Sequence, residues 1–354
     1  MKKSLILTLM LFFSAVLILQ AQEFKWKKLQ TEAYPGKQDD IAFINPLQGW
    51  YVNGAGNIYH TEDGGVSWVK QWEKKGTFFR TIAFVDENIG FAGTVGTDYF
   101  PNVSDTIPLY GTQDGGKSWH PVAYSGPYVK GLCAIDIVRE QYINHGKTDY
   151  KVHLFAVGRV GSPANLLVSH DGGATWTSQS LQESGKMLFD IKMFDKNTGI
   201  ACSASDEDIS KSNALILKTI DGGKTWSKVY QSDRPLEITW KASFPTEQIG
   251  YVTIQSYDPN NTQQRIAKTT DGGNTWKEMD LWEDAGAREF GIGFIDELHG
   301  YVGTVNSGFE TRDGGMTWEK IDLGMACNKI QIYKEEQKTY GYAIGVDVFK
   351  LTAE

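Results

Sequence analysis

Residues 61–68 read Thr-Glu-Asp-Gly-Gly-Val-Ser-Trp, and the pattern Ser/Thr-x-Asp-Gly-Gly-x-Ser/Thr-Trp occurs six times in the 354-residue chain. Its aspartates are Asp63, Asp114, Asp171, Asp221, Asp271 and Asp313. Successive copies are separated by 51, 57, 50, 50 and 42 residues. A period of that size, with glycine-rich turns and alternating apolar runs, is typical of a repeating β unit.

A second phrase, an apolar run followed by a turn and a glycine–aromatic pair, precedes each aspartate phrase. It starts at Ile41–Phe43 with Gly49-Trp50, and its seventh copy starts at Ile330–Tyr333. A degenerate third copy carries an insertion, Arg139–Tyr150, which we expect to separate its two strands. Seven strand pairs with six aspartate phrases leave the last unit one outer strand short.

The N-terminal segment can supply the missing strand. Phe24–Lys27 resembles Val66–Val69, which contains the end of the first aspartate phrase and the residue after it. A ring closed by its first strand leaves only short edges exposed to aggregation. The sequence therefore predicts an all-β fold, a seven-bladed β-propeller of four-stranded antiparallel blades over residues 22–354, with the N-terminal strand completing the last blade.

The repeated aspartates have a structural explanation. Each carboxylate can accept hydrogen bonds from backbone N–H groups of its own turn, and the Gly-Gly pair supplies the positive φ angles of a tight hairpin. The tryptophan that ends the phrase is expected to pack between adjacent sheets. We therefore predict that the six aspartates are turn residues and not a catalytic or metal-binding array.

The phrases from Ile41 to Trp68 resemble those of the Asp-box (BNR) repeat β-propellers. They are most similar to the photosystem II stability/assembly factor-like proteins, and more distantly to sialidase and sortilin-type propellers. The resemblance covers the chain from about Phe24 to Thr352. It implies the fold, and it implies a structural role for the repeated motif, but the fold supports many functions.

The ends and the composition limit the class of protein. Met1–Ala21 has a lysine-containing start, an apolar run and a small residue for cleavage, which predicts a signal peptide cleaved near Ala21 and a secreted or periplasmic protein. A membrane anchor is the alternative, although the run is shorter than the roughly 20 residues of a span. The net charge of −8 without a basic run argues against nucleic acid. Cys133, Cys202 and Cys327 are expected to be buried thiols, with a Cys133–Cys202 bridge as the alternative.

A binding site is expected on the face formed by the connections between blades and by the B–C loops, where A to D denote the strands of a blade from the channel outward. Long B–C loops at Thr97–Leu109, Ser203–Asn213 and Gln255–Gln263 give this face a raised rim. Acidic, basic and aromatic residues are also expected around the channel mouth on this face. The candidate binding residues are Asp39, Asp40, Arg80, Tyr99, Phe100, Lys130, Lys186, Glu237, Trp240, Tyr257, Arg288 and Glu289.

Two classes of function remain open at this point. The first is a non-catalytic platform that binds an exported or envelope protein segment, or a polysaccharide, and we expect a monomer without cofactor or metal. The alternative is a glycoside hydrolase, sialidase-like or another type with a carboxylate pair, or a polysaccharide lyase. Asp39 or Asp40 with Glu237 or Glu289 would supply the two carboxylates. The chain has only seven arginines and lacks the Arg-Ile-Pro phrase expected of a sialidase, so we favour the binding platform and assign no catalytic residue.

Overall fold

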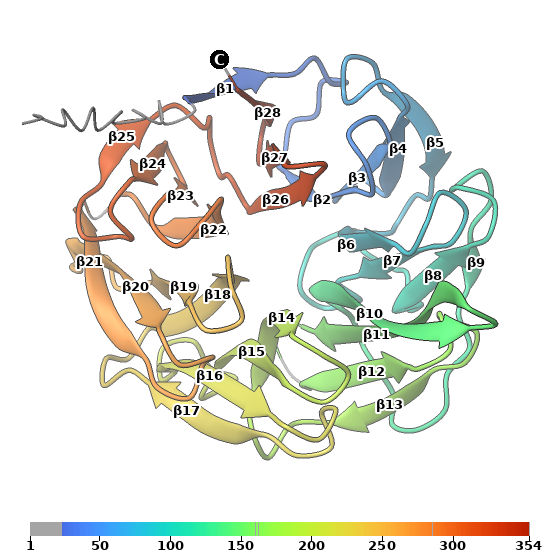
Figure 1. The fold of residues 1–354 in the computed structure, drawn as a ribbon. Helices are drawn as coiled ribbons and strands as arrows, with labels where there is room; N and C mark the ends of the chain where they lie inside the picture. Colours follow the sequence, from blue (N-terminus) through green and yellow to red (C-terminus); the bar gives the residue numbers. More distant parts are fainter. Residues whose placement is uncertain (1–22, 160, 162, 285, 354) are drawn as a thin grey trace, which may run out of the picture.

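The computed structural model describes residues 23–159, 161, 163–284 and 286–353, and the predicted signal peptide lies outside these residues. The chain folds into seven four-stranded antiparallel sheets arranged as the blades of a ring (Figure 1). In blades 1 to 6 the first strand lies at the central channel and the last at the rim, whereas in blade 7 β26 lies at the channel and β1 at the rim. The predicted all-β, seven-bladed architecture is confirmed.

The first four blades follow the chain from residue 38. Blade 1 is β2 (Gln38–Phe43), β3 (Gly49–Asn53), β4 (Asn57–Thr61) and β5 (Val69–Glu73). Blade 2 is β6 (Phe79–Phe84), β7 (Gly90–Thr94), β8 (Leu109–Thr112) and β9 (His120–Pro121). Blade 3 is β10 (Ala134–Asn144), β11 (Lys147–Gly158), β12 (Asn165–Ser169) and β13 (Thr177–Ser180). Blade 4 is β14 (Met187–Met193), β15 (Gly199–Ala204), β16 (Ala214–Thr219) and β17 (Ser227–Gln231).

The remaining blades complete the ring. Blade 5 is β18 (Glu237–Ser243), β19 (Gly250–Ser256), β20 (Gln263–Thr269) and β21 (Lys277–Glu283). Blade 6 is β22 (Glu289–Phe294), β23 (Gly300–Thr304), β24 (Gly308–Thr311) and β25 (Glu319–Ile321). Blade 7 is β26 (Lys329–Glu335), β27 (Lys338–Ile344) and β28 (Val348–Ala353), with β1 (Phe24–Lys28) as its outer strand.

The two ends of the chain close the ring together. β1 pairs antiparallel with β28, from Phe24 opposite Ala353 to Lys28 opposite Phe349. The Trp26 ring meets the Tyr301 ring of blade 6 edge-on, with centroids 5.2 Å apart, so β1 also contacts the neighbouring blade. The predicted closure by the N-terminal strand is confirmed.

The aspartate turns follow one hydrogen-bond pattern. In the first, Asp63 accepts hydrogen bonds from the Ser67 N–H at 2.9 Å and from the Thr61 hydroxyl at 2.8 Å. The Thr61 hydroxyl in turn accepts the Gly65 N–H at 2.9 Å, and Gly64 and Gly65 have φ angles of +71° and +90°. These hydrogen bonds, above all those from Ser67, lower the pKa of Asp63 to about 2. The other five aspartates bind their own turns in the same way.

The tryptophans that end these phrases lie between blades, as expected. Trp119, Trp176, Trp226 and Trp318 are buried, and Trp68 and Trp276 are partly buried. The turns hold the C and D strands together, and the indoles join each blade to its neighbour. The structure therefore gives the repeated phrase a role in folding at all six positions.

Charged pairs join the inner strands across blade boundaries. Asp40 of β2 accepts the Ile82 N–H of β6 at 2.9 Å, and its other oxygen lies 2.5 Å from the Lys329 ammonium of β26. Asp190 and Asp136 also accept a backbone N–H of the next inner strand, but each pairs with a lysine of that same strand, Lys241 or Lys192. Inner strands of neighbouring blades share no ladder, so these side chains satisfy backbone donors that would otherwise be unpaired.

Blade 3 differs from the others on the face of the aspartate turns. The insertion at Arg139–Tyr150, expected to separate two strands, instead lengthens them: β10 and β11 stay paired from Ala134 opposite Val157 to Asn144 opposite Lys147. The two residues between these strands, His145 and Gly146, both have positive φ, as a two-residue hairpin turn requires. β12 pairs only with Leu154–Gly158, so residues 139–152 project beyond the blade as a two-stranded ribbon.

The cysteines are free and buried, as expected for the thiol interpretation: Cys133, Cys202 and Cys327 form no disulfide. Burial raises the pKa of the Cys327 thiol to about 12. Within the described ranges, no cluster of three or more His, Cys, Asp and Glu side chains has the arrangement of a metal site. No helix in that part of the chain is long and apolar enough to cross a membrane.

Candidate binding site

A layer of side chains closes the channel near the predicted face. It contains one residue from the first half or the middle of each inner strand, or from just before that strand, and every one is buried: Asp39, Arg80, Cys133, Phe189, Trp240, Phe290 and Asn328. Arg80 of blade 2 reaches across to blade 5, where its guanidinium lies 5.0 Å from the Trp240 ring centroid. The predicted channel mouth is therefore a floor, and a ligand on this face would rest on it.

The floor carries a buried ion cluster. Asp39 forms ion pairs with the Arg80 guanidinium and with the Lys37 ammonium, the latter at 3.1 Å. Lys37 also lies 5.9 Å from the Phe290 ring centroid. Burial, and then the positive charge of Arg80, lower the pKa of Lys37 to about 8, although Asp39 opposes the shift. One buried carboxylate thus serves two cations, which leaves positive charge at the floor.

Aromatic rings and further arginines surround this floor. The Arg288 guanidinium lies 4.6 Å from the Tyr257 ring centroid and 5.2 Å from that of Phe290. Tyr99, in the long B–C loop of blade 2, is 43 % exposed. Burial raises the pKa of Tyr99, while the charges of Arg80, Arg288 and Arg159 oppose the rise, which places Tyr99 within the field of all three guanidinium groups.

The B–C loop of blade 2 is tied down on this face. Arg159 donates hydrogen bonds to the carbonyls of Val95 and Thr97 at 3.2 and 3.1 Å. Lys130 forms an ion pair with Asp98 of the same loop. Phe100 stacks on Phe78 with centroids 4.4 Å apart. The loop is therefore held against the blade, while the Tyr99 side chain stays exposed.

Several buried donors of this face have no hydrogen-bond partner in the described structure. They are Arg159 Nε, Trp240 Nε1, Gln255 Nε2 and Arg288 Nε. A buried polar atom without a partner costs about 1–3 kcal/mol. Donor nitrogens collected beside guanidinium groups suit an acceptor-rich ligand, and above all a carboxylate.

The remaining predicted residues have other surroundings. Asp40 lies in the channel wall and bonds β6 and Lys329, and Lys186 donates to the Gln182 carbonyl at 2.7 Å. Glu289 begins β22, and its side chain is not among those the structure describes. The structure thus brings together Asp39, Arg80, Tyr99, Trp240, Tyr257 and Arg288, and it adds Lys37, Arg159 and Gln255, which sequence reasoning missed.

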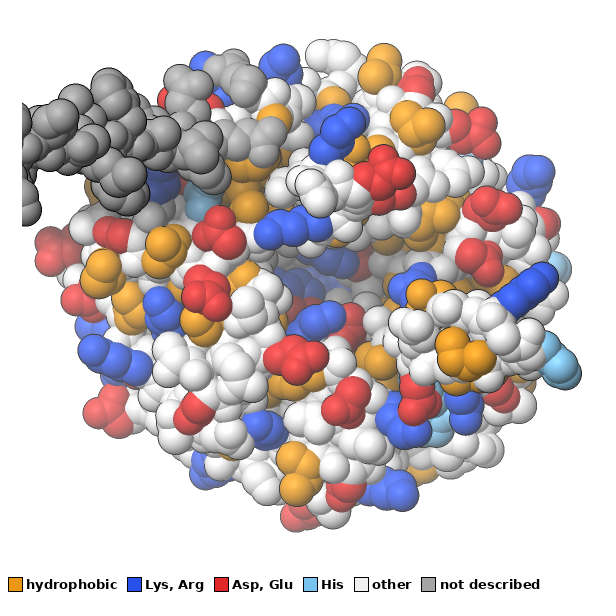
Figure 2. Space-filling view, viewed as in Figure 1, with side chains coloured by type: hydrophobic (Ala, Val, Ile, Leu, Met, Phe, Trp, Pro, Cys, Tyr) orange, Lys and Arg blue, Asp and Glu red, His pale blue; other side chains and the backbone are white. Residues whose placement is uncertain are grey.

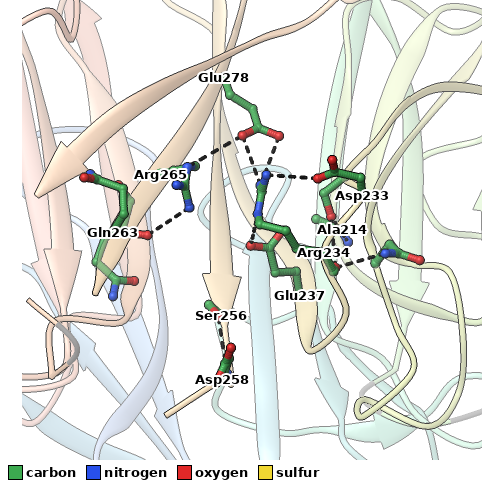
Figure 3. Close-up of polar contacts among 12 residues, drawn as sticks. Ala214, Asp233, Arg234, Glu237, Ser256, Asp258, Gln263, Arg265 and Glu278 are labelled. Atoms are coloured by element: carbon green, nitrogen blue, oxygen red, sulfur yellow. Dashed lines mark hydrogen bonds and ion pairs between the residues drawn. The ribbon is translucent and has the colours of Figure 1, made fainter. Parts of the chain in front are cut away.

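Glu237, predicted at the mouth, belongs to a separate ion network between blades 4 and 5 (Figure 3). Its side chain is buried, and Arg234 donates from Nε to one of its oxygens at 2.6 Å. The other end of Arg234 donates to both oxygens of Glu278 at 3.0 Å, and Figure 3 shows Arg265 approaching Glu278 from the next strand. Burial opposes the charge of Arg234, but its hydrogen bonds to Glu237 and Glu278 raise its pKa.

The opposite face of the floor opens into a cavity of about 1190 Å³ lined by inner strands of all seven blades. Figure 2 looks onto that face and shows a central hollow bordered by basic and acidic side chains. Asp136, Asp190, Lys192 and Lys329 lie on its wall, and each is engaged in the blade-to-blade pairs described above. These charges stabilise the ring, and sequence reasoning, which directed the site to the other face, did not predict the cavity.

No protein-family model matches this chain. The vacuolar protein sorting/targeting protein 10 of Lodderomyces elongisporus is 26 % identical over 150 residues, 41 % of this chain, which thereby spans only about 9 % of that protein's length. YCF48 bound to a D1 peptide has a TM-score of 0.63 at 16 % identity and aligns with 95 % of this chain and 96 % of its own.

A second YCF48 structure, from Cyanidioschyzon merolae, also has a TM-score of 0.63 at 16 % identity and covers 92 % of this chain and 98 % of its own. The GH74 enzyme of Niastella koreensis has a TM-score of 0.59 at 15 % identity, covering 88 % of this chain and 51 % of its own. The fold is a seven-bladed β-propeller. At these identities the likeness establishes the fold alone, and both binding proteins and enzymes share it.

Proposed function

We propose that this β-propeller is an exported platform that binds a protein segment on the face closed by Arg80 and Trp240. The observation that carries the proposal is the set of buried, unpartnered donors beside Arg288, Arg159 and Arg80, with Tyr99 and Tyr257 next to them. Guanidinium groups bind carboxylates, and aromatic rings supply apolar contact to the rest of a peptide. YCF48, a propeller of the same extent, has been captured with a D1 peptide, which supports this class of ligand.

The surroundings of the acidic side chains on this face support a binding function over glycoside hydrolysis. A glycosidase needs one carboxyl group to hold a proton and a second to stay free as base or nucleophile. Asp39 is buried and paired with two cations, and Glu237 is buried and paired with Arg234. Both carboxylates are therefore buried in fixed ion pairs, whereas the acid and the base or nucleophile of a glycosidase must be free to reach the substrate.

The test is a binding titration of the mature chain with a panel of peptides that carry a free C-terminal carboxylate, each matched with its C-terminal amide. We expect binding to the free acids, and we expect Arg288→Ala to weaken it by roughly tenfold or more, because a charge-assisted hydrogen bond contributes about 1.5–3 kcal/mol. Arg312→Ala is the matched control, since Arg312 is an exposed arginine beside the Asp313 turn on the other face. Equal affinity for acids and amides, or equal loss in the two variants, would contradict the proposal.

A further inference from the structure

The projecting ribbon of blade 3 has an unpaired edge. Gly172 donates its N–H to the Val152 carbonyl at 3.0 Å, so the backbone groups of even-numbered residues of β11 point away from β10. Successive residues of a strand point their backbone groups to alternate sides, so the N–H and C=O groups of Thr148 and Tyr150 point away from β10 as well. The Tyr150 N–H donates to the Asp149 carboxylate at 2.8 Å, which leaves the Thr148 N–H and C=O and the Tyr150 C=O to pair with an added strand. β12 pairs with β11 only as far as Leu154, so it does not cover them.

The same ribbon exposes large apolar side chains. Tyr142 is 44 %, Ile143 is 68 % and Tyr150 is 50 % exposed. A cavity of about 590 Å³ lies at the unpaired edge, between Tyr150–Val152 and the turn at Asp171 and Gly172. An exposed strand edge with apolar neighbours is a template for another strand, and proteins usually shorten or cover such edges. The ribbon is neither short nor covered.

The turn at Gly172 limits which strand can be added. Because it already occupies the edge at Val152, an added strand can pair only with Lys147–Tyr150. Suppose that the added strand is β11 of a second copy, antiparallel and related by a two-fold axis. The register that keeps its tip clear of the Gly172 turn then places Thr148 opposite Thr148 of the second copy. The tip of the second ribbon then ends in the cavity beside Asp171. An added Cβ on Gly146 at this tip would meet nothing within 4 Å, so the tip is open to contact.

This register matches charge with charge. Lys147 lies directly opposite Asp149 of the second copy, and Asp149 lies opposite Lys147 of the second copy. Both are non-hydrogen-bonded positions, where side chains across an antiparallel pair are closest. A shift of two residues would place Asp149 opposite itself and Lys147 opposite Lys151, so the register that the turn permits is also the one that pairs opposite charges.

We propose that two copies of this chain associate through the β11 edge into a four-stranded sheet, with two Lys147–Asp149 pairs across the interface. The exposed Ile143 and Tyr150 then lie on one face of that sheet, and Tyr142 lies on the other. The face with Arg80 and Trp240 is opposite to the ribbon and stays open in both copies. The proposal replaces the monomer expected from the sequence.

Sedimentation velocity of the mature protein over about a hundredfold range of concentration tests the proposal. We expect a monomer–dimer equilibrium that weakens with added salt, because the two ion pairs are exposed. Lys147→Asp and Asp149→Lys should each raise the dimer dissociation constant by roughly tenfold or more, since each substitution places like charges opposite each other twice.

An exchange of charges between positions 147 and 149 distinguishes the proposed interface from other modes of dimerisation. In an equimolar mixture of Lys147→Asp and Asp149→Lys, opposite charges face each other again, so a mixed dimer should form; the double variant should also recover. Both positions are exposed on the ribbon, and circular dichroism should show unchanged folding. A wild type that stays monomeric throughout, or a dimer that both single variants leave intact, would overturn the proposal. Binding of another protein to a monomeric wild type would do the same.

Discussion

Trp26→Ala tests how much the first strand contributes to the closed ring. Trp26 is partly buried against blade 6, edge-on to Tyr301, and its indole nitrogen has no hydrogen-bond partner, so the substitution removes apolar contact alone. Truncating a fully buried tryptophan to alanine lowers the free energy of unfolding by about 3–5 kcal/mol. Because Trp26 is only partly buried, we take half of that value and add part of an edge-on ring contact, which gives a loss of roughly 2–3 kcal/mol. With about 2.1 cal/mol/K of unfolding entropy per residue, a chain of this length should lose roughly 3–4 °C in Tm.

The assay is thermal unfolding followed by circular dichroism at a fixed scan rate. Lys27→Ala is the matched control, because Lys27 is the next residue of β1 and is exposed. It should change the free energy of unfolding by no more than about 0.5 kcal/mol. If both variants melt at the wild-type temperature, β1 does not hold blades 6 and 7 together, and our account of closure is wrong.

Three further predictions concern the turns, the floor and the thiols. Because Asp63 and Asp271 have folded pKa values of about 2, below the usual value near 3.9, their stabilisation is complete above about pH 4 and is lost as the pH falls toward 2. Asp271→Asn should reduce the pH dependence of the free energy of unfolding measured by denaturant titration. An unchanged pH dependence would refute this role of the aspartate turn. Arg80→Ala leaves Asp39 with Lys37 alone and should cost about 3–5 kcal/mol in urea unfolding, whereas the exposed Arg312→Ala should be near neutral. A thiol reagent should leave Cys133, Cys202 and Cys327 unmodified in the native protein and label them after unfolding; rapid native labelling would show that they are accessible.

The fold could be predicted from the sequence because its signals are local and repeated. Each Asp-Gly-Gly phrase specifies its own hairpin, and each glycine–aromatic pair marks the strand before it. Even the closure followed from local likeness, since Phe24–Lys27 resembles an outer strand. The projecting ribbon differs from the expectation that Arg139–Tyr150 separates two strands, although the alternating tyrosine, isoleucine and charged residues of this segment are compatible with strands.

The site could be predicted only in part, because the sequence does not show which side chains approach one another across the ring. Alignment of the repeats placed Arg80, Trp240 and Arg288 on one face, and the structure groups them there. It could not show that Arg80 crosses to blade 5 and closes the channel, nor that Asp40 belongs to the wall. Lys37 and Arg159 were missed since each lies outside the repeated phrases, in connections whose paths depend on the whole ring.

The pairing of β1 with β28 has a consequence for the order of folding. Phe24 and Ala353 are 329 positions apart (353 minus 24), so their contact is among the most non-local in the protein. Blades 1 to 6 are each made of consecutive residues and can form as they leave the ribosome, whereas blade 7 needs both ends of the chain. The strand that is synthesised first therefore finds its partner last, and until then the outer edge of β28 has no strand to cover it.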